Sequence, residues 1–463
     1  MAEHHARSND RLSSPSTLKN IPWTARFREA TKKLTIVLLW ALVVGAITGL
    51  VGSAFRLGVE ALLNQRQILA NAVRDTPVLA WLVPTLVAGG MVQISFYLVR
   101  RFAPETAGSG IPQVEGAIDG LLPFEWRRIL PVKFFGGLLS IGAGMIAGFE
   151  GPTIQMGGSI GQMVGQWAKL DRENLRILIA AGAGAGLTTA FNAPIAGILF
   201  VTEEVRPKFR SWIVSYRAVM IACITATIVL RLILGQKAFL KIERFEIVPL
   251  DALWMFLPLG IALGILGYLF NLFLFRAIDF FSGTRGWFHR GLGFLVGGTI
   301  GFLGWWYAPL VGGGDGTVIW SLDNHSSAGI LWLVLLGRFA LTLLCYGSGE
   351  IGGIFAPMLA LATLLSLALA KTFDTWFPHV LPEPGVFAVA GMGGLVAATV
   401  RAPLTAALLT FELTDNFSII LPMLITCVSA AIVAHFLGGE PVYSVLLRRA
   451  CERASDETLT DQV

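Results

Sequence analysis

A single carboxylate in an apolar stretch is the residue of this chain best suited to chemistry. Glu150 lies in Gly148-Phe149-Glu150-Gly151-Pro152, among long apolar segments in which a charge is costly and needs a reason. The flanking glycines let the backbone open and expose N–H groups, and Pro152 suits the first turn of a helix. An opened backbone that leads into a helix N-terminus binds anions. Glu150 can therefore occupy an anion site when ionised and leave it when protonated, which makes it a candidate proton-controlled gate.

Two more stretches interrupted by glycine and proline could present backbone N–H groups at a helix start. They are Gly108-Ser109-Gly110-Ile111-Pro112 and Gly353-Ile354-Phe355-Ala356-Pro357. A lone tyrosine, Tyr443, follows the last apolar run. Simpler roles exist for these polar residues, because Ser109 could be a helix cap and Tyr443 an anchor at the membrane interface.

The composition indicates a polytopic membrane protein. The chain has 463 residues, of which 54% are hydrophobic and 14% charged, whereas soluble proteins carry about 25% charged residues. Several apolar runs are long enough to span a bilayer, namely Leu34–Val51, Val78–Val99, Leu253–Phe275 and Ile419–Phe436. The basic residues behind the net charge of +5 flank these runs and form no patch with interleaved aromatics, which disfavours nucleic-acid binding.

The polar interruptions divide the chain into four parts. We expect a cytoplasmic N-terminal segment (1–33), a first transmembrane repeat (34–240), a second transmembrane repeat (241–445) and a short cytoplasmic tail (446–463). The basic N-terminal segment lacks the cleavage pattern of a signal peptide, and its positive charge places it in the cytoplasm. We expect a multi-pass protein of the cell inner (plasma) membrane with both termini cytoplasmic. The four cysteines have no metal or disulfide spacing, and Cys223, Cys345 and Cys427 are expected to be packing residues.

A weak internal repeat relates the two halves. Ala193-Pro194 and Ala402-Pro403 are each followed by an apolar run and by a glutamate nine residues beyond the proline, Glu203 and Glu412. Lys133 with Gly148-x-x-x-Pro152 parallels Arg338 with Gly353-x-x-x-Pro357 at the same spacing. Such repeats bring broken helices together near the membrane midplane, where substrates bind. We expect Gly151–Lys169 and Gly353–Ala368 to be tilted or partial spans, and Lys133, Arg338, Arg401 and Glu412 to be structural ion-pair or capping groups.

Six motifs in a fixed order carry a family resemblance. Besides the three interrupted stretches they are Phe191-Asn192-Ala193-Pro194, Glu203-Glu204 and the late Tyr443. With these motifs the chain resembles the CLC family of chloride channels and chloride/proton antiporters over about residues 34 to 450, and in particular its bacterial antiporters. The resemblance implies an all-α membrane homodimer, with two inverted-topology repeats of tilted and broken helices and a separate pathway in each subunit.

The implied activity is secondary transport that exchanges chloride for protons across the lipid bilayer. A passive chloride channel of the same fold is the main alternative, and an intramembrane enzyme or organic-solute carrier is a remote one. An enzyme is disfavoured because the sequence has no P-loop, metal cluster or nucleophile constellation, and we expect neither a cofactor nor a metal. The presence of Ser109 disfavours a fluoride-selective relative.

The resemblance also implies a role for each site residue. The hydroxyls of Ser109 and Tyr443 and the N–H groups of Ile354 and Phe355 would bind a central chloride. The N–H groups of Phe149, Glu150, Gly151 and Ala356 would form an outer site, at which Glu150 is the gating glutamate. Hydroxyls and helix N-termini suit a partly dehydrated chloride, because a full positive charge would hold the ion too tightly for turnover.

Proton transfer on the inner side is implied for Glu204, with its neighbour Glu203 as a second candidate. Adjacent helical residues point about 100° apart, so one of them alone can readily line a given pathway. The repeat mate of Glu203, Glu412, suggests a scaffold role for Glu203.

Two positions depart from the family pattern. Phe149 replaces a residue that is usually basic, and Glu350-Ile351 replaces the Ala-Pro common in bacterial relatives. We expect Phe149 to make the surroundings of the gate more apolar and to favour protonated Glu150.

Overall fold

Helices form nearly all the regular structure of this protein. The structure, a computed structural model, describes residues 23–205, 212–236, 239–284, 286–323, 326–376 and 383–460. The first twenty-two residues of the expected N-terminal segment and the last three of the tail therefore lie outside the described residues. Within these ranges no strand is present, and the expected all-α class is confirmed.

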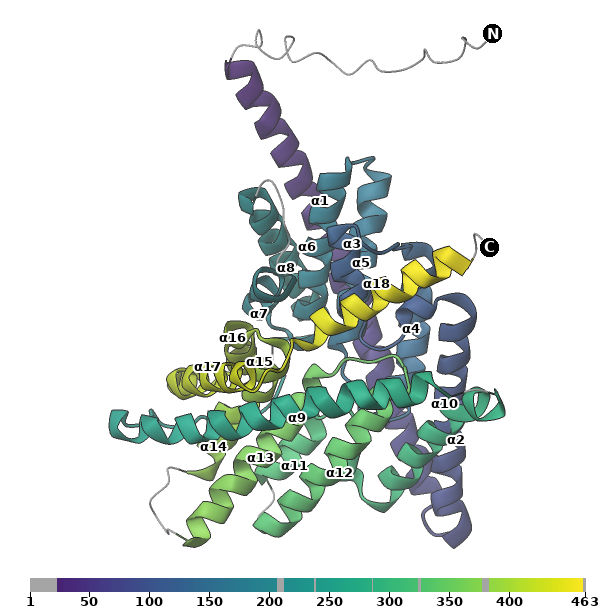
Figure 1. Cartoon of the computed structure of the whole chain (residues 1–463), viewed down its shortest axis with the longest axis vertical. Helices are drawn as coiled ribbons and strands as arrows, with labels where there is room; N and C mark the ends of the chain where they lie inside the picture. Colours follow the sequence, from purple (N-terminus) through teal and green to yellow (C-terminus); the bar gives the residue numbers. More distant parts are fainter. Residues whose placement is uncertain are drawn as a thin grey trace.

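The first half of the chain contains a long helix, a second span and a series of shorter helices. Their bounds are α1 (Trp23–Ala72), α2 (Pro77–Phe102), the 3₁₀ turn η1 (Pro104–Thr106), α3 (Ile111–Asp119), α4 (Trp126–Gly142), α5 (Glu150–Trp167), α6 (Arg172–Phe191), α7 (Pro194–Phe200), the π-helical turn η2 (Val201–Val205) and α8 (Trp212–Leu234). In Figure 1, α1 (purple) extends along much of the long axis.

The second half repeats this order, except that two short helices, α14 and α15, stand where the first half has α6, and that a further helix, α18, follows the repeat. The bounds are η3 (Leu250–Met255), α9 (Phe256–Ser282), α10 (Gly286–Trp306), η4 (Ala308–Leu310), α11 (Asp315–Asp323), α12 (Ala328–Gly347), α13 (Phe355–Trp376), α14 (Pro384–Met392), α15 (Gly394–Val400), α16 (Pro403–Thr414), η5 (Phe417–Ile419), α17 (Ile420–Phe436) and α18 (Val442–Thr460).

Eight helices within the described ranges are long and apolar enough to cross a membrane. They include all four of the expected runs. Gly353–Ala368 was expected to be a tilted or partial span; α13 is longer than this segment, since it continues to Trp376, and it is one of the eight, so a partial span is excluded there while a tilted one stays an expectation. Lys371 and Asp374 end the apolar run of the sequence, but both are compatible with a helix, so the helix continues past them.

The helices that begin at the interrupted stretches, α5 and α13, lie in the interior. Every residue of α5 from Glu150 to Gly165 is buried. Glycines make this possible, because a Cβ added to Gly157 would lie 2.1 Å from the carbonyl oxygen of Gly182 in α6, and one added to Gly182 would lie 2.0 Å from that of Gly157. Small residues thus let the backbones of α5 and α6 touch, as in other membrane helix pairs.

The repeated glutamates explain how the two halves are joined. Glu412, on α16, accepts hydrogen bonds from the first-turn amides of Ile195 (3.0 Å) and Ala196 (2.8 Å) in α7. Glu203, in η2 directly after α7, accepts hydrogen bonds from the amides of Leu404 (3.2 Å) and Thr405 (2.8 Å) in α16. Each glutamate therefore caps the helix N-terminus of the opposite half, where a negative charge also complements the helix dipole.

The repeated cations also have equivalent roles. Buried Lys133, on α4, donates to the carbonyls of Thr106 (2.9 Å) and Gly108 (2.8 Å) in the loop before α3. Buried Arg338, on α12, donates to the carbonyls of Pro309 (3.1 Å), Val311 (2.9 Å) and Gly312 (2.9 Å) in the loop before α11. These contacts agree with the structural roles expected for both cations, since each satisfies carbonyls that would otherwise be buried without a donor.

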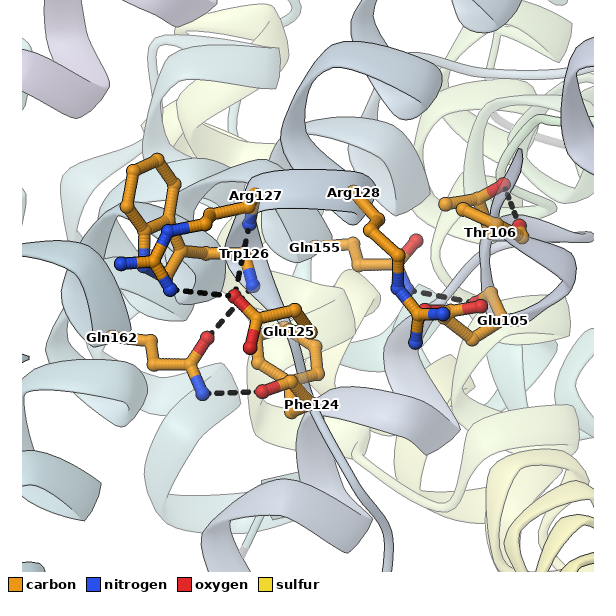
Figure 2. A network of polar contacts seen from close by, with 10 residues as sticks. Glu105, Thr106, Phe124, Glu125, Trp126, Arg127, Arg128, Gln155 and Gln162 are labelled. Carbon is orange, nitrogen blue, oxygen red and sulfur yellow. Dashed lines mark hydrogen bonds and ion pairs between the residues drawn. The ribbon is translucent and has the colours of Figure 1, made fainter.

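Polar side chains hold the segments around α3 against α5 (Figure 2). Gln155 of α5 donates to the carbonyl of Glu105 (2.9 Å), and Gln162 of α5 accepts from the amide of Trp126 (2.9 Å) and donates to the carbonyl of Phe124. Arg128 pairs with the Glu105 carboxylate at 3.0 Å. The loop that carries Ser109 is thus fixed to the helix that carries Glu150.

Most of the residues that were expected to form a short tail (446–463) belong to a helix. Helix α18 begins at Val442 and ends at Thr460, and it packs on α3. Figure 1 shows α18 (yellow) running across the molecule next to α3. Tyr443 therefore lies in the first turn of a helix that returns toward the Ser109 loop.

Candidate functional site

The three interrupted stretches meet in a small set of backbone hydrogen bonds. The amide of Gly148 donates to the carbonyl of Gly353 (2.9 Å), and the amide of Gly353 donates back to Gly148 (3.0 Å). The amide of Gly108 donates to the carbonyl of Glu350 (3.1 Å), and that of Gly352 donates to Gly108 (3.2 Å). The sequence predicted the stretches but not this pairing, which brings the starts of α3, α5 and α13 to one place.

Glu150 is fully buried in the first turn of α5, and its carboxylate lies at the N-terminus of α13. Its Oε1 accepts a hydrogen bond of 2.7 Å from the amide of Phe355, and the amide of Ala356 also faces the carboxylate. A Cβ added to Gly148 would lie 2.0 Å from the Oε2 of Glu150, and a Cβ added to Gly353 would lie 2.0 Å from its Oε1. The two glycines therefore provide the space in which the carboxylate occupies an anion-binding helix terminus.

Ser109 is buried directly beside the first turn of α5. A Cβ added to Gly151 would lie 2.8 Å from the Cα of Ser109, so the two backbones are in contact. The Ser109 Oγ accepts hydrogen bonds of 3.3 Å from the amide of Ile111 and of 3.3 Å from the hydroxyl of Tyr346. Ser109 is thus both a local cap, as its simpler interpretation predicts, and part of the buried polar cluster.

Tyr443 has no exposed surface, which excludes the interfacial-anchor alternative. Its ring packs against that of Phe355 with centroids 6.1 Å apart. Its hydroxyl is buried without a hydrogen-bond partner among the described residues. The hydroxyl is within electrostatic range of Tyr346, Glu150, Glu204 and Glu115. A buried hydroxyl without a partner is a donor whose presence packing alone does not explain.

A cavity of about 180 Å³ reaches Ser109 from the surface of α18. Its lining includes Ser109, Tyr346, Gln113 and the arginines Arg449 and Arg453. Arg449 also pairs with Asp279 at 2.8 Å. Sequence reasoning missed these arginines, because residues 446–463 were expected only as a short cytoplasmic tail. Arg453 adds a positive charge to this lining, whereas the charge of Arg449 is offset by Asp279.

The two adjacent glutamates have different surroundings. Glu203 holds the N-terminus of α16, as the repeat suggested. Glu204 follows it in η2 and interacts electrostatically with Glu115, a buried carboxylate on α3. Glu115 was missed, although an acid among Val114, Gly116, Ala117 and Ile118 six residues after Ser109 was a usable signal.

The two departures from the family pattern lie close to the site. Phe149 packs edge-on against Phe55 with centroids 6.5 Å apart, so the residue beside the gate adds apolar surface, as expected. Glu350 is buried and faces Ser95 and Arg100 of α2. Its backbone carbonyl also accepts from Gly108, which ties this acid to the Ser109 loop.

Comparison with known proteins finds relatives along almost the whole chain. A family model described as voltage gated chloride channel matches residues 90–435. The H(+)/Cl(-) exchange transporter ClcA of Yersinia pseudotuberculosis is 44% identical over 429 residues, which cover 92% of this chain and 90% of the relative. The transporter of the same name from Vibrio cholerae is 46% identical over 421 residues and 89% of each chain.

Solved structures share the fold. The crystal structure of a slow cyanobacterial Cl⁻/H⁺ antiporter is 55% identical, with a TM-score of 0.87, and the match covers 90% of this chain and 98% of the other. A CLC-type fluoride/proton antiporter is 20% identical with a TM-score of 0.72 over 89% of this chain and 97% of the other, which shows the fold alone. Because the family model spans most of the chain and relatives exceed 40% identity over almost all of it, this protein belongs to the voltage-gated chloride channel (CLC) family.

Proposed function

We propose that this protein exchanges chloride for protons across a membrane as a secondary active transporter. The observation that carries the proposal is the position of the Glu150 carboxylate, which accepts the Phe355 amide at the N-terminus of α13. A titratable anion of the protein thus occupies a place suited to a free anion. Relatives named as exchangers at 44% to 46% identity support exchange over a passive channel. The proposed cycle involves neither an enzymatic reaction nor a cofactor.

The proposed anion route uses neutral donors. The hydroxyls of Ser109 and Tyr443 with the amides of Ile354 and Phe355 bind a central chloride, and the amides of Phe149, Glu150, Gly151 and Ala356 form the outer site. When Glu150 is ionised, its carboxylate accepts the hydrogen bond of the Phe355 amide and excludes chloride from that place. When Glu150 is protonated, its affinity for these donors falls, because a neutral acid is a weaker acceptor, and chloride replaces it.

The proposed proton route reaches Glu150 through Glu204. The Tyr443 hydroxyl is within electrostatic range of both carboxylates, which supports a location of Glu204 on the same route. Because both oxygens of Glu203 are engaged at the N-terminus of α16, we assign proton transfer to Glu204 and a capping role to Glu203.

A liposome assay tests the exchange. Purified protein is reconstituted with a chloride gradient and no proton gradient, and a pH electrode follows the external solution. We expect chloride moving down its gradient to drive protons uphill in the opposite direction, and the reversal potential to shift when a proton gradient is added. A reversal potential that follows chloride alone, with no proton movement, would identify a passive channel.

We further propose that the protein works as a homodimer in the plasma membrane, each subunit with its own pathway and both termini in the cytoplasm. The basic residues before the first span support the orientation. Ile195 on α7 and Leu404 on α16 are exposed apolar side chains in the first turns that Glu412 and Glu203 cap. They support a subunit contact on that surface.

A further inference from the structure

Tyr346 is a buried tyrosine beside the proposed chloride site that no motif singled out. It lies in the last turn of α12, on the second half of the chain, whereas Ser109 belongs to the first half. Its hydroxyl lies 3.3 Å from the Ser109 Oγ, and a Cβ added to Gly108 would lie 3.4 Å from the same hydroxyl. Tyr346 also lines the cavity that leads to Ser109 from α18.

The hydrogen bonds of Ser109 restrict where its own proton can point. A serine hydroxyl has two acceptor lone pairs and one O–H donor. The Oγ of Ser109 accepts from the amide of Ile111 and from the hydroxyl of Tyr346, each at 3.3 Å, so both lone pairs are engaged. The serine O–H remains as the free donor. A serine without such partners would readily turn its proton toward a nearby backbone carbonyl.

The two tyrosines near Ser109 therefore differ. The Tyr443 hydroxyl is buried with no hydrogen-bond partner among the described residues, so it is free to donate directly to an anion. The Tyr346 hydroxyl is instead engaged with Ser109, and the amide of Ser109 also faces it. A donor engaged in this way acts on the anion through its partner.

We propose that Tyr346 is a positioning residue of the chloride site: its hydroxyl donates to the Ser109 Oγ and so keeps the serine proton directed at the bound anion. This inference rests on the proposed role of Ser109 in chloride binding. Donation from Tyr346 also polarises the serine O–H and makes it a better donor, because hydrogen bonds in a chain strengthen one another in a low-dielectric interior.

A double-mutant cycle tests this role. Chloride affinity of the full-length protein in detergent is measured by calorimetry for the wild type, Ser109→Ala, Tyr346→Phe and the double variant. Losing one neutral hydrogen bond weakens binding roughly two- to tenfold, so we expect each single variant to lose affinity in this range. The double variant should bind no more weakly than Ser109→Ala alone, because Tyr346 acts only through the serine.

The outcomes separate this inference from the proposed site. Wild-type affinity in Ser109→Ala would reject the central-site assignment and this inference with it. Weak binding in Ser109→Ala with wild-type binding in Tyr346→Phe would reject this inference alone. Additive losses in the double variant would also overturn it, since they would mean that Tyr346 acts directly or through general stability. Tyr97→Phe, at an exposed tyrosine of α2, is the matched control and should bind as the wild type.

Discussion

At the scale of single residues, the proposed gate depends on one buried carboxylate that lies at a helix terminus of the opposite half. Glu150 belongs to α5 but holds the first amide of α13, and the backbone exchange between Gly148 and Gly353 keeps the two helix starts together. The carboxylate therefore competes for the same donors that would bind chloride.

Replacement of Glu150 should remove proton control. Glu150→Gln mimics the protonated acid, and Glu150→Ala leaves the donors of α13 without the carboxylate. We expect chloride flux in both variants to be largely independent of pH and uncoupled from protons, as measured by chloride efflux and by a pH electrode. The gate assignment fails if either variant still drives protons uphill along a chloride gradient.

A more specific prediction concerns the space around the carboxylate. In Gly148→Ala the new methyl group would lie 2.0 Å from Glu150 Oε2, and its three nearest atoms all belong to the Glu150 carboxyl group. Because a side chain moves more easily than backbone, the carboxylate should leave its place while the fold is kept. We expect chloride flux at high pH to rise several-fold toward that of Glu150→Ala.

Gly90→Ala is the matched control for this variant, because a Cβ at Gly90 meets no atom within 4 Å. It should behave as the wild type in the same efflux assay. A wild-type pH profile in Gly148→Ala would mean that the observed place of the carboxylate is not the closed state of the gate.

The inner glutamate gives a third prediction at this scale. Glu204→Gln keeps the shape of the side chain and removes its titration. We predict that proton transport stops while chloride still moves, because the proposed anion donors are unchanged. Proton transport at the wild-type rate, measured with a pH electrode, would place the inner relay elsewhere.

At the scale of the elements, the repeat serves to join the halves through exchanged caps. Helix α6 ends at Phe191 and α15 at Val400. Their C-cap residues, Asn192 and Arg401, are both in the left-handed conformation, and each is followed by the Ala-Pro that starts α7 or α16. Nine residues beyond each proline, the glutamate reaches the start of the other short helix. The repeated spacing thus sets the distance along the chain between the start of each short helix and the glutamate that caps the other.

The exchanged caps should contribute equally to stability. Glu203→Gln and Glu412→Gln each remove a charge from a helix N-terminus, at a cost of roughly 0.5–2 kcal/mol. We expect thermal unfolding in detergent to shift downward by a similar amount in both variants, with coupled transport retained. The exposed Glu452→Gln on α18 is the control and should unfold as the wild type. Loss of proton transport in Glu203→Gln alone would instead assign this residue to the proton route.

At the scale of the whole molecule, the proposed chloride site takes residues from both halves. Ser109 and Glu150 come from the first half, and Phe355, Tyr346 and Tyr443 from the second. The cavity beside Ser109 is also lined by Arg449 and Arg453 of α18, so the last helix contributes to the surroundings of the proposed site.

The proposed assembly gives a prediction at this scale. Ile195 and Leu404, which are 46% and 49% exposed, occupy equivalent positions in the first turns of α7 and α16. A surface related by internal symmetry suits a two-fold contact with a second copy. Light scattering in detergent should give a protein mass near twice 49.9 kDa. A single 49.9 kDa species in detergent and in lipid nanodiscs would contradict the homodimer.

The sequence by itself determined the features that depend on local chemistry. Apolar runs identify spans because each must match the thickness of a bilayer, and the Gly/Pro punctuation around Glu150 identifies a helix start because it acts within a few residues. The equal spacing from Pro194 to Glu203 and from Pro403 to Glu412 revealed the repeat, because this pattern too lies within a few residues. The C-terminal end of α13 was missed, because Lys371 and Asp374 end the apolar run of the sequence without ending the helix.

Only the tertiary structure decided which of these residues meet. The pairing of Gly148 with Gly353 and the contact of Tyr346 with Ser109 join residues more than two hundred positions apart, and no local pattern encodes such a contact. The interaction of Glu115 with Glu204 and the packing of α18 on α3 likewise join segments that no local pattern links. Local sequence sets where the chain can open to bind an anion, whereas the packing of the two halves sets which side chains surround that opening.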